Sequence, residues 1–148
     1  MLDLFDRIVH LDQTQMFHAH LKPHPPKDAL NKETSPITTI LTIYLPADYS
    51  IKERQEFEDG CKKLLAAAKN APEGCNSHAA GWIVEEIQVP GGEEKSVAYA
   101  ACIGAESVQA RSTHGEPRWF KDIVDFVKNA RRFKYLEVCH ASLLMVQK

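Results

Sequence analysis

The chain has 148 residues, of which 44% are hydrophobic and 26% are charged, and these values predict one globular domain. The formal charge of -2 and the absence of a basic cluster argue against nucleic acid and against an anionic membrane as partners. No apolar run is long enough to span a membrane, and Asp3, Asp6 and Arg7 interrupt the first apolar residues, so we expect a cytoplasmic protein without a signal peptide.

Residues 1–35 are predicted to form an extension, because their apolar positions lead into the prolines around His24, where no helix can continue. One short helix before these prolines fits the apolar spacing. The extension is rich in histidine, which raises the alternative of a metal site, but the loose spacing favours a solvated arm. Its histidines are His10, His18, His20 and His24. The domain itself is predicted over residues 36–148, with no metal.

The first half of the domain is predicted to be a strand followed by a helix. Residues 37–45 (ITTILTIYL) are mostly β-branched, aliphatic or aromatic, which is typical of a buried strand. Ser50 and Glu53 form a capping-box pattern that starts a long amphipathic helix, and Pro72 and Gly74 mark its end.

The second half repeats this order with an additional strand. Residues 81–89 and 95–103 flank a PGGEE connector and are predicted to pair as antiparallel strands. A short helix, a break near Gly115 and a second long helix are predicted next. Residues 135–146 (YLEVCHASLLMV) complete the pattern as a strand with both faces largely covered.

The element order β-α-β-β-α-β predicts an α+β, ferredoxin-like sandwich, in which an antiparallel sheet carries both helices on one face. The other face has too few polar residues to be left in solvent. We therefore expect a homodimer in which two such faces are buried together as an α+β barrel.

Two stretches of the sequence resemble a known family. Residues 106–110 (ESVQA) with 116–121 (EPRWFK) resemble its ESVEAH...ETxxFK segment, and residues 136–140 (LEVCH) resemble its VEVHH final strand. The family is that of the dimeric α+β barrels, which includes antibiotic-biosynthesis monooxygenases and stress-responsive barrel proteins, and the likeness is greatest to fungal members. Arg111 and Cys139 stand where relatives often have histidine.

The resemblance covers about residues 37–146 and implies a pocket for a small hydrophobic or aromatic molecule. Family members carry out cofactor-free oxygenation, cyclisation or isomerisation of polyketide-like and phenolic compounds, and others only bind. The resemblance therefore implies a cofactor-independent tailoring enzyme of specialised metabolism, a cyclase, isomerase or monooxygenase. The alternative is a non-catalytic small-molecule-binding or stress-responsive barrel. A third alternative is a regulatory dimer that acts through its N-terminal arm.

Three residues are candidates for catalysis. His140, in the last strand, is the candidate general base, and the alternative is a core histidine whose ring is hydrogen-bonded. His114, in the break between the helices, is a second candidate, although an exposed loop histidine without a task fits equally. Tyr44 offers a phenol that could hold an enolate oxygen, and the alternative is a core aromatic residue.

Four further residues are candidates for binding the substrate. Tyr99 and two indoles offer aromatic walls, and Glu85 could orient a histidine if its side chain points inward. Glu86 would then point to the opposite face, because neighbours on a strand alternate. The binding candidates are Tyr99, Trp82, Trp119 and Glu85.

The sequence predicts neither a cofactor nor a disulfide. It contains no Gly-rich phosphate loop, nucleophile elbow or dinucleotide fingerprint. Its four cysteines are scattered without a CxxC pair and are expected to be free thiols. They are Cys61, Cys75, Cys102 and Cys139.

Overall fold

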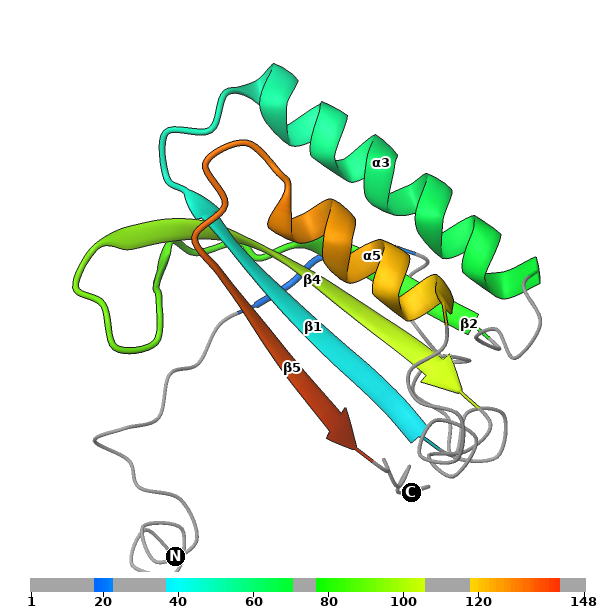
Figure 1. Cartoon of the computed structure of the whole chain (residues 1–148). Coiled ribbons are helices and arrows are strands. Elements are labelled where there is room, and N and C mark those ends of the chain that lie inside the picture. Colours follow the sequence, from blue (N-terminus) through cyan, green and yellow to red (C-terminus); the bar gives the residue numbers. More distant parts are fainter. Residues whose placement is uncertain (1–17, 23–36, 71–76, 106–117, 142–148) are drawn as a thin grey trace, which may run out of the picture.

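The computed structural model describes residues 18–22, 37–70, 77–105 and 118–141. Five strands form one antiparallel sheet, and two helices lie together on one of its faces (Figure 1). The elements are β1 (Ile37–Pro46), α3 (Ile51–Asn70), β2 (Ser77–Trp82), β3 (Ile87–Gln88), β4 (Lys95–Ala105), α5 (Arg118–Lys128) and β5 (Tyr135–Ala141). This architecture confirms the predicted α+β class and is compatible with a ferredoxin-like fold.

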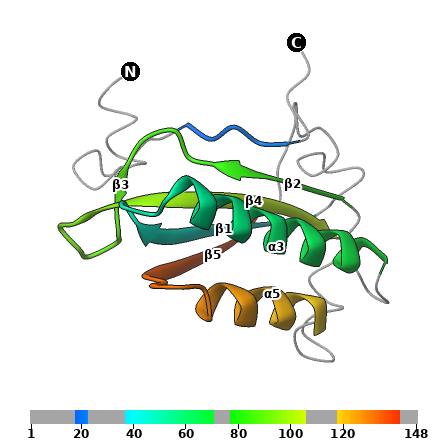
Figure 2. The same cartoon turned by 90° about the horizontal axis from the view of Figure 1, so that it is seen from above.

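The strand order is β2-β4-β1-β5, and β3 pairs with the beginning of β4. β1 is central, because it pairs with β4 from Ile37↔Ala105 to Pro46↔Ser96 and with β5 from Thr38↔Ala141 to Tyr44↔Tyr135. β5 therefore forms one edge of the sheet, and in Figure 2 helix α5 of the helix layer lies nearest to this edge.

Helix α3 begins with the predicted capping box. The Glu53 N–H donates to Ser50 Oγ at 3.0 Å, and the Ser50 N–H donates to Glu53 Oε1 at 3.3 Å. Gly60 lets α3 approach α5 closely, because a Cβ there would lie 2.3 Å from Cζ of Phe126. The buried side chains of α3 recur at helical spacing: Phe57, Cys61, Leu65 and Ala68.

The main core lies between the helices and the sheet. Alternate residues of β1 and β4 point into it, as the two-residue period of a strand requires. Phe57 is at its centre, with ring centroids 5.5 Å from Tyr99, 6.0 Å from Trp82 and 5.7 Å from Phe126. The fully buried members of this core from the sheet are Leu41, Ile43, Leu45, Tyr99 and Ile103.

The chain's own N-terminal arm, residues 18–22, runs beside β2 at the end of the sheet opposite β5, and its Leu21 side chain covers part of the helix-free face. The arm is extended and pairs antiparallel with β2, with bridges Ala19↔Ile83 and Lys22↔Ala80. In Figure 2 it runs alongside β2, on the side of β2 away from β4. Leu21 of the arm packs against two small clusters on this face, which contain Ala79, Ala98, Ala100, Cys102 and Tyr44.

Gly81 is the position in β2 that allows the arm to lie so close. A Cβ at this residue would stand 1.6 Å from the carbonyl oxygen of His20, which is an impossible separation. Only glycine fits where another backbone approaches to this distance.

Two predictions about the strands were wrong. Residues 81–89 do not form one strand, because β2 ends at Trp82, and Glu85 and Glu86 lie in a bend before β3. The last strand is not covered on both faces, because β5 is an edge strand on which Tyr135 and Val138 are each 41% exposed. The predicted short helix near Gly115 and the strand beyond residue 141 lie outside the described residues. The short helix predicted before the prolines of the extension does not include residues 18–22, which are extended, and residues 1–17 lie outside the described residues.

The turn between α5 and β5 is held by Arg132. Its φ of 56° lies in the left-handed region, which is uncommon for a residue other than glycine. Its guanidinium pairs with Asp48 at 2.8 Å and with Glu53 at 3.4 Å, and it lies over the Tyr49 ring at 5.6 Å. The Tyr49 hydroxyl donates to the carbonyl of Arg131. These contacts join the α5–β5 turn to the start of α3.

Cys61 and Cys102 are buried and Cys139 is exposed, and all three are free thiols, as predicted. Burial raises the pKa of the Cys61 thiol to about 12, so it is protonated at neutral pH. Cys75 lies outside the described residues. Within the part of the chain that the structure describes, neither helix is long and apolar enough to cross a membrane.

Candidate functional site

A groove lies between helix α5 and the edge strand β5. Its volume is about 610 Å³, which is within the range of small-molecule pockets. Its lining residues are Phe120, Val124, Lys128, Phe133, Lys134, Tyr135, Leu136, Val138 and His140. Six of the seven residues predicted to act in catalysis or binding are described by the structure, and of these six His140 is the one that lines this groove.

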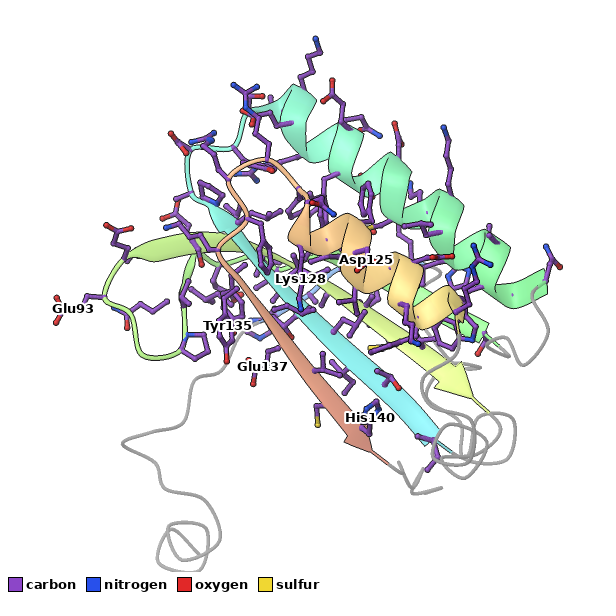
Figure 3. The ribbon with its side chains drawn as sticks, in the orientation of Figure 1. Glu93, Asp125, Lys128, Tyr135, Glu137 and His140 are labelled. Carbon is purple, nitrogen blue, oxygen red and sulfur yellow. The ribbon has the colours of Figure 1, made fainter. Side chains whose placement is uncertain are left out.

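The groove follows from two regular spacings in the sequence. Phe120, Val124 and Lys128 recur every four residues and therefore share one face of α5. Alternate residues of β5, from Leu136 to His140, share the strand face that looks toward the helix. Figure 3 shows Lys128 at the end of α5 and His140 near the end of β5, both on this side, whereas Glu137 points away.

His140 is oriented by the neighbouring strand. It stands opposite Thr39 in the β1–β5 register, and its Nδ1 shares a hydrogen bond of 2.9 Å with Thr39 Oγ1. Its ring centroid is 6.5 Å from that of Phe120. The alternative of a core histidine was wrong, because His140 is hydrogen-bonded but exposed at the sheet edge.

The other end of the groove carries two lysines. The Nζ of Lys134 pairs with Glu94 Oε2 at 3.2 Å, and the Lys134 N–H donates to the Tyr44 carbonyl at 3.1 Å. Lys128 is the last residue of α5 and is exposed. Among the described residues, no carboxylate forms an ion pair with Lys128.

Tyr44 does not reach this groove. It lies five residues along β1 from Thr39, and therefore on the opposite face of the sheet from His140. Its hydroxyl donates to Glu137 Oε2 at 3.1 Å. Burial, followed by the charge of Glu137, raises the pKa of this phenol to about 12. Tyr44 can donate a hydrogen bond at neutral pH but cannot act as a base.

Tyr99 and Trp82 are brought together, but in the core beneath α3. Their rings are 5.0 Å apart, and the Arg54 guanidinium lies 5.8 Å from the Trp82 ring. Burial raises the pKa of Tyr99, and its hydroxyl is buried without a hydrogen-bond partner among the described residues. Trp119 is buried in edge contact with Phe120 at 6.0 Å, behind the groove wall.

Glu85 forms hydrogen bonds with His18 of the arm and does not line the groove. Its Oε2 accepts the His18 N–H at 2.8 Å, and its Oε1 lies 2.6 Å from His18 Nδ1. These hydrogen bonds lower the pKa of Glu85 to about 2. His114 lies outside the described residues, so its place relative to His140 stays a prediction.

A second, smaller cavity of about 190 Å³ lies where α3 begins and α5 ends. It is lined by Tyr49, Glu53, Glu56, Phe57, Phe126, Ala130 and Arg131. Glu53 is already bonded to Ser50 and Arg132, so this cavity belongs to the contacts that hold the α5–β5 turn. No group of described residues has the three His, Cys, Asp or Glu side chains that a metal ion would need.

The sequence analysis missed Thr39 and Lys128. The signal for Lys128 was the stripe Phe120-Val124-Lys128, in which a helical apolar face ends on a cation. Thr39 gave no such signal, because its contact with His140 depends on the pairing of strands about a hundred residues apart. Comparisons with protein-family models, with curated proteins and with solved structures found no significant match to this chain.

Proposed function

We propose that this chain is a cofactor-independent enzyme of specialised metabolism that uses His140 as a general base on a phenolic or polyketide-like molecule bound between α5 and β5. The observation that carries the proposal is the orientation of His140 by Thr39 within a groove of about 610 Å³. The apolar walls from Phe120, Val124 and Val138 suit an aromatic body.

The first chemical step follows from the basicity of imidazole near neutral pH. A C–H bond next to a carbonyl, or a phenol O–H bond, breaks as the proton moves to the imidazole. The electron pair stays on the substrate as an enolate or phenolate, next to the imidazolium that forms when His140 takes the proton. Cyclisation and isomerisation can follow directly, whereas oxygenation consumes dioxygen as the oxidant.

A homodimeric barrel is part of the same proposal. The arm already covers the β2–β4 side of the helix-free face through Leu21, so a second copy would contact the β1–β5 side. Tyr135, Glu137 and Cys139 are exposed there. Native mass spectrometry of the wild type and of Tyr135→Lys tests it: we expect a dimer that the lysine weakens, and a monomeric wild type would contradict the dimer.

One observation favours the alternative of a protein that binds small molecules without chemistry. His140 is exposed, and a base that water reaches easily gains little from a pre-organised, dry environment. On this alternative, Thr39 and His140 supply polar contacts to a bound ligand and no turnover occurs.

Deuterium uptake by 2-tetralone in D2O separates the two functions. Its carbon acid exchanges when a base removes the proton, and mass spectrometry measures the exchange. A general base typically contributes about 100-fold or more, so we expect His140→Ala to lose the protein-catalysed exchange. His20→Ala, which removes an exposed histidine of the arm, is the matched control and keeps it. Equal exchange in both variants would reject the base.

A further inference from the structure

The charge of the groove lining differs from that of the chain as a whole. The full chain has a formal charge of -2, yet among the described residues that line the groove none is acidic, and Lys128, Lys134 and His140 carry or can carry positive charge. The remaining lining residues are apolar or aromatic. A pocket of this kind favours a ligand with an apolar body and a negative group.

Lys128 is the residue placed to hold that negative group. The ammonium of Lys134 is already bonded to Glu94, whereas no described carboxylate pairs with Lys128. A cation in the last turn of a helix is favoured by the helix dipole whatever it binds. What distinguishes Lys128 is the groove that it lines together with Phe120 and Val124.

The lysine and the imidazole stand at opposite ends of the groove. Phe120 contacts His140, with ring centroids 6.5 Å apart, and Lys128 lies two turns further along α5. This separation of eight residues corresponds to about 12 Å of helix axis. The flexible lysine stem shortens the span that a ligand must cover, so two fused aromatic rings match the length between the two ends.

We infer that the groove binds a fused aromatic acid, with its carboxylate at Lys128 and its acidic O–H or C–H at His140. The inference deepens the proposed function, since it takes the same groove as the binding site and names the substrate class. It also gives each end of the groove a role. Lys128 at the end of α5 holds the anion, and His140, next to Thr39 of β1, removes the proton. A neutral molecule of the same shape would bind less tightly.

The test compares two fluorescent probes on the full chain at pH 7. 6-Hydroxy-2-naphthoate carries a carboxylate and a neutral phenol, and 6-(hydroxymethyl)-2-naphthol has the same rings without the charge. Fluorescence titration gives Kd for each. We expect the acid to bind about tenfold more tightly than the alcohol, as one charged hydrogen bond supplies. Raising the salt concentration should reduce this difference.

Variants of two lysines on α5 make the result specific. Lys128→Gln should remove the roughly tenfold preference for the acid, and Lys121→Gln, which removes the same charge from an exposed position outside the groove, should keep it. Equal loss in both variants, or none in Lys128→Gln, would overturn the inference.

The experiments can contradict the proposed base, His140, and the proposed anion site, Lys128, independently of each other. If wild-type protein prefers the acid through Lys128 but does not exchange 2-tetralone, the anion site stands and the base is wrong. If exchange depends on His140 but the two probes bind alike, the base stands and the substrate class is wrong.

Discussion

The two faces of the sheet are covered by elements of different size, and the side chains beneath them differ accordingly. The helix side presents Leu41, Ile43 and Tyr99, whose bulk fills the space under two helices. The opposite side presents Ala79, Ala98 and Ala100, over which a single extended segment lies. Large side chains of the sheet therefore fill the space beneath the helices, whereas the small ones on the opposite side leave room for Leu21 of the arm to pack close to the sheet.

The largest effect is expected in the helix-side core. Phe57→Ala removes the ring at the centre of the aromatic cluster and should lower the free energy of unfolding by about 3–5 kcal/mol, through lost contacts and a cavity. Urea denaturation measures it. Ile51→Ala, at a residue 88% exposed, is the control and should change stability little. Similar losses in both variants would contradict the placement of the core.

On the opposite face, the addition of a single methyl group at Gly81 should lower the stability of the docked arm. Gly81→Ala places a Cβ on the His20 carbonyl and should displace the arm, with a stability loss of about 1–2 kcal/mol from the exposure of Leu21. Hydrogen exchange should accelerate at the His20 and Lys22 amides, which donate to β2. Gly92→Ala meets nothing closer than 3.4 Å and is the control. Unchanged exchange in Gly81→Ala would show that the arm does not depend on this glycine.

Removal of the hydroxyl from one tyrosine on each face of the sheet should change stability in opposite directions. Tyr99→Phe removes a buried hydroxyl without a described partner and should raise stability by about 1 kcal/mol. Tyr44→Phe removes a hydroxyl bonded to Glu137 and should lower stability by a similar amount, about 1 kcal/mol. Thermal unfolding at pH 7 measures both. A loss in Tyr99→Phe would show that this hydroxyl is bonded in solution.

The smallest effect concerns the arm and pH. The pKa of Glu85 falls from its ordinary value of 4.5 to about 2 when it accepts the hydrogen bonds of His18. A lowered carboxyl pKa stabilises the docked arm fully above about pH 4.5, and this contribution is lost as pH falls toward 2. NMR amide signals of residues 18–22 should report the loss. Glu85→Gln should abolish this pH dependence, and a pH dependence retained in that variant would exclude Glu85 as its origin.

Much of the domain could be predicted because its signals are local. The β-branched run of β1 and the capping box of Ser50 and Glu53 each specify an element within a few residues. The order of these elements then restricts the sheet to few topologies. Helix α5 was predicted for the same reason, from apolar residues at helical spacing.

The pairing of the arm with β2 and the edge position of β5 could not be predicted in this way. The arm residues His18 to Lys22 have little strand propensity, and they pair with β2 about sixty residues away. The visible trace of that pairing is Gly81, which in the sequence resembles any glycine in a strand. The exposure of His140 follows from which strands flank β5, and neither periodicity nor composition records this.

The left-handed turn at Arg132 holds helix α5 and strand β5 together at the lysine end of the groove. Only the residues between Lys128 and Tyr135 connect the helix to the strand, and Arg132 ties that connection to Asp48 and Glu53. The lysine end of the groove is therefore closed by a short covalent link. This turn therefore limits the length of a ligand at the lysine end of the groove.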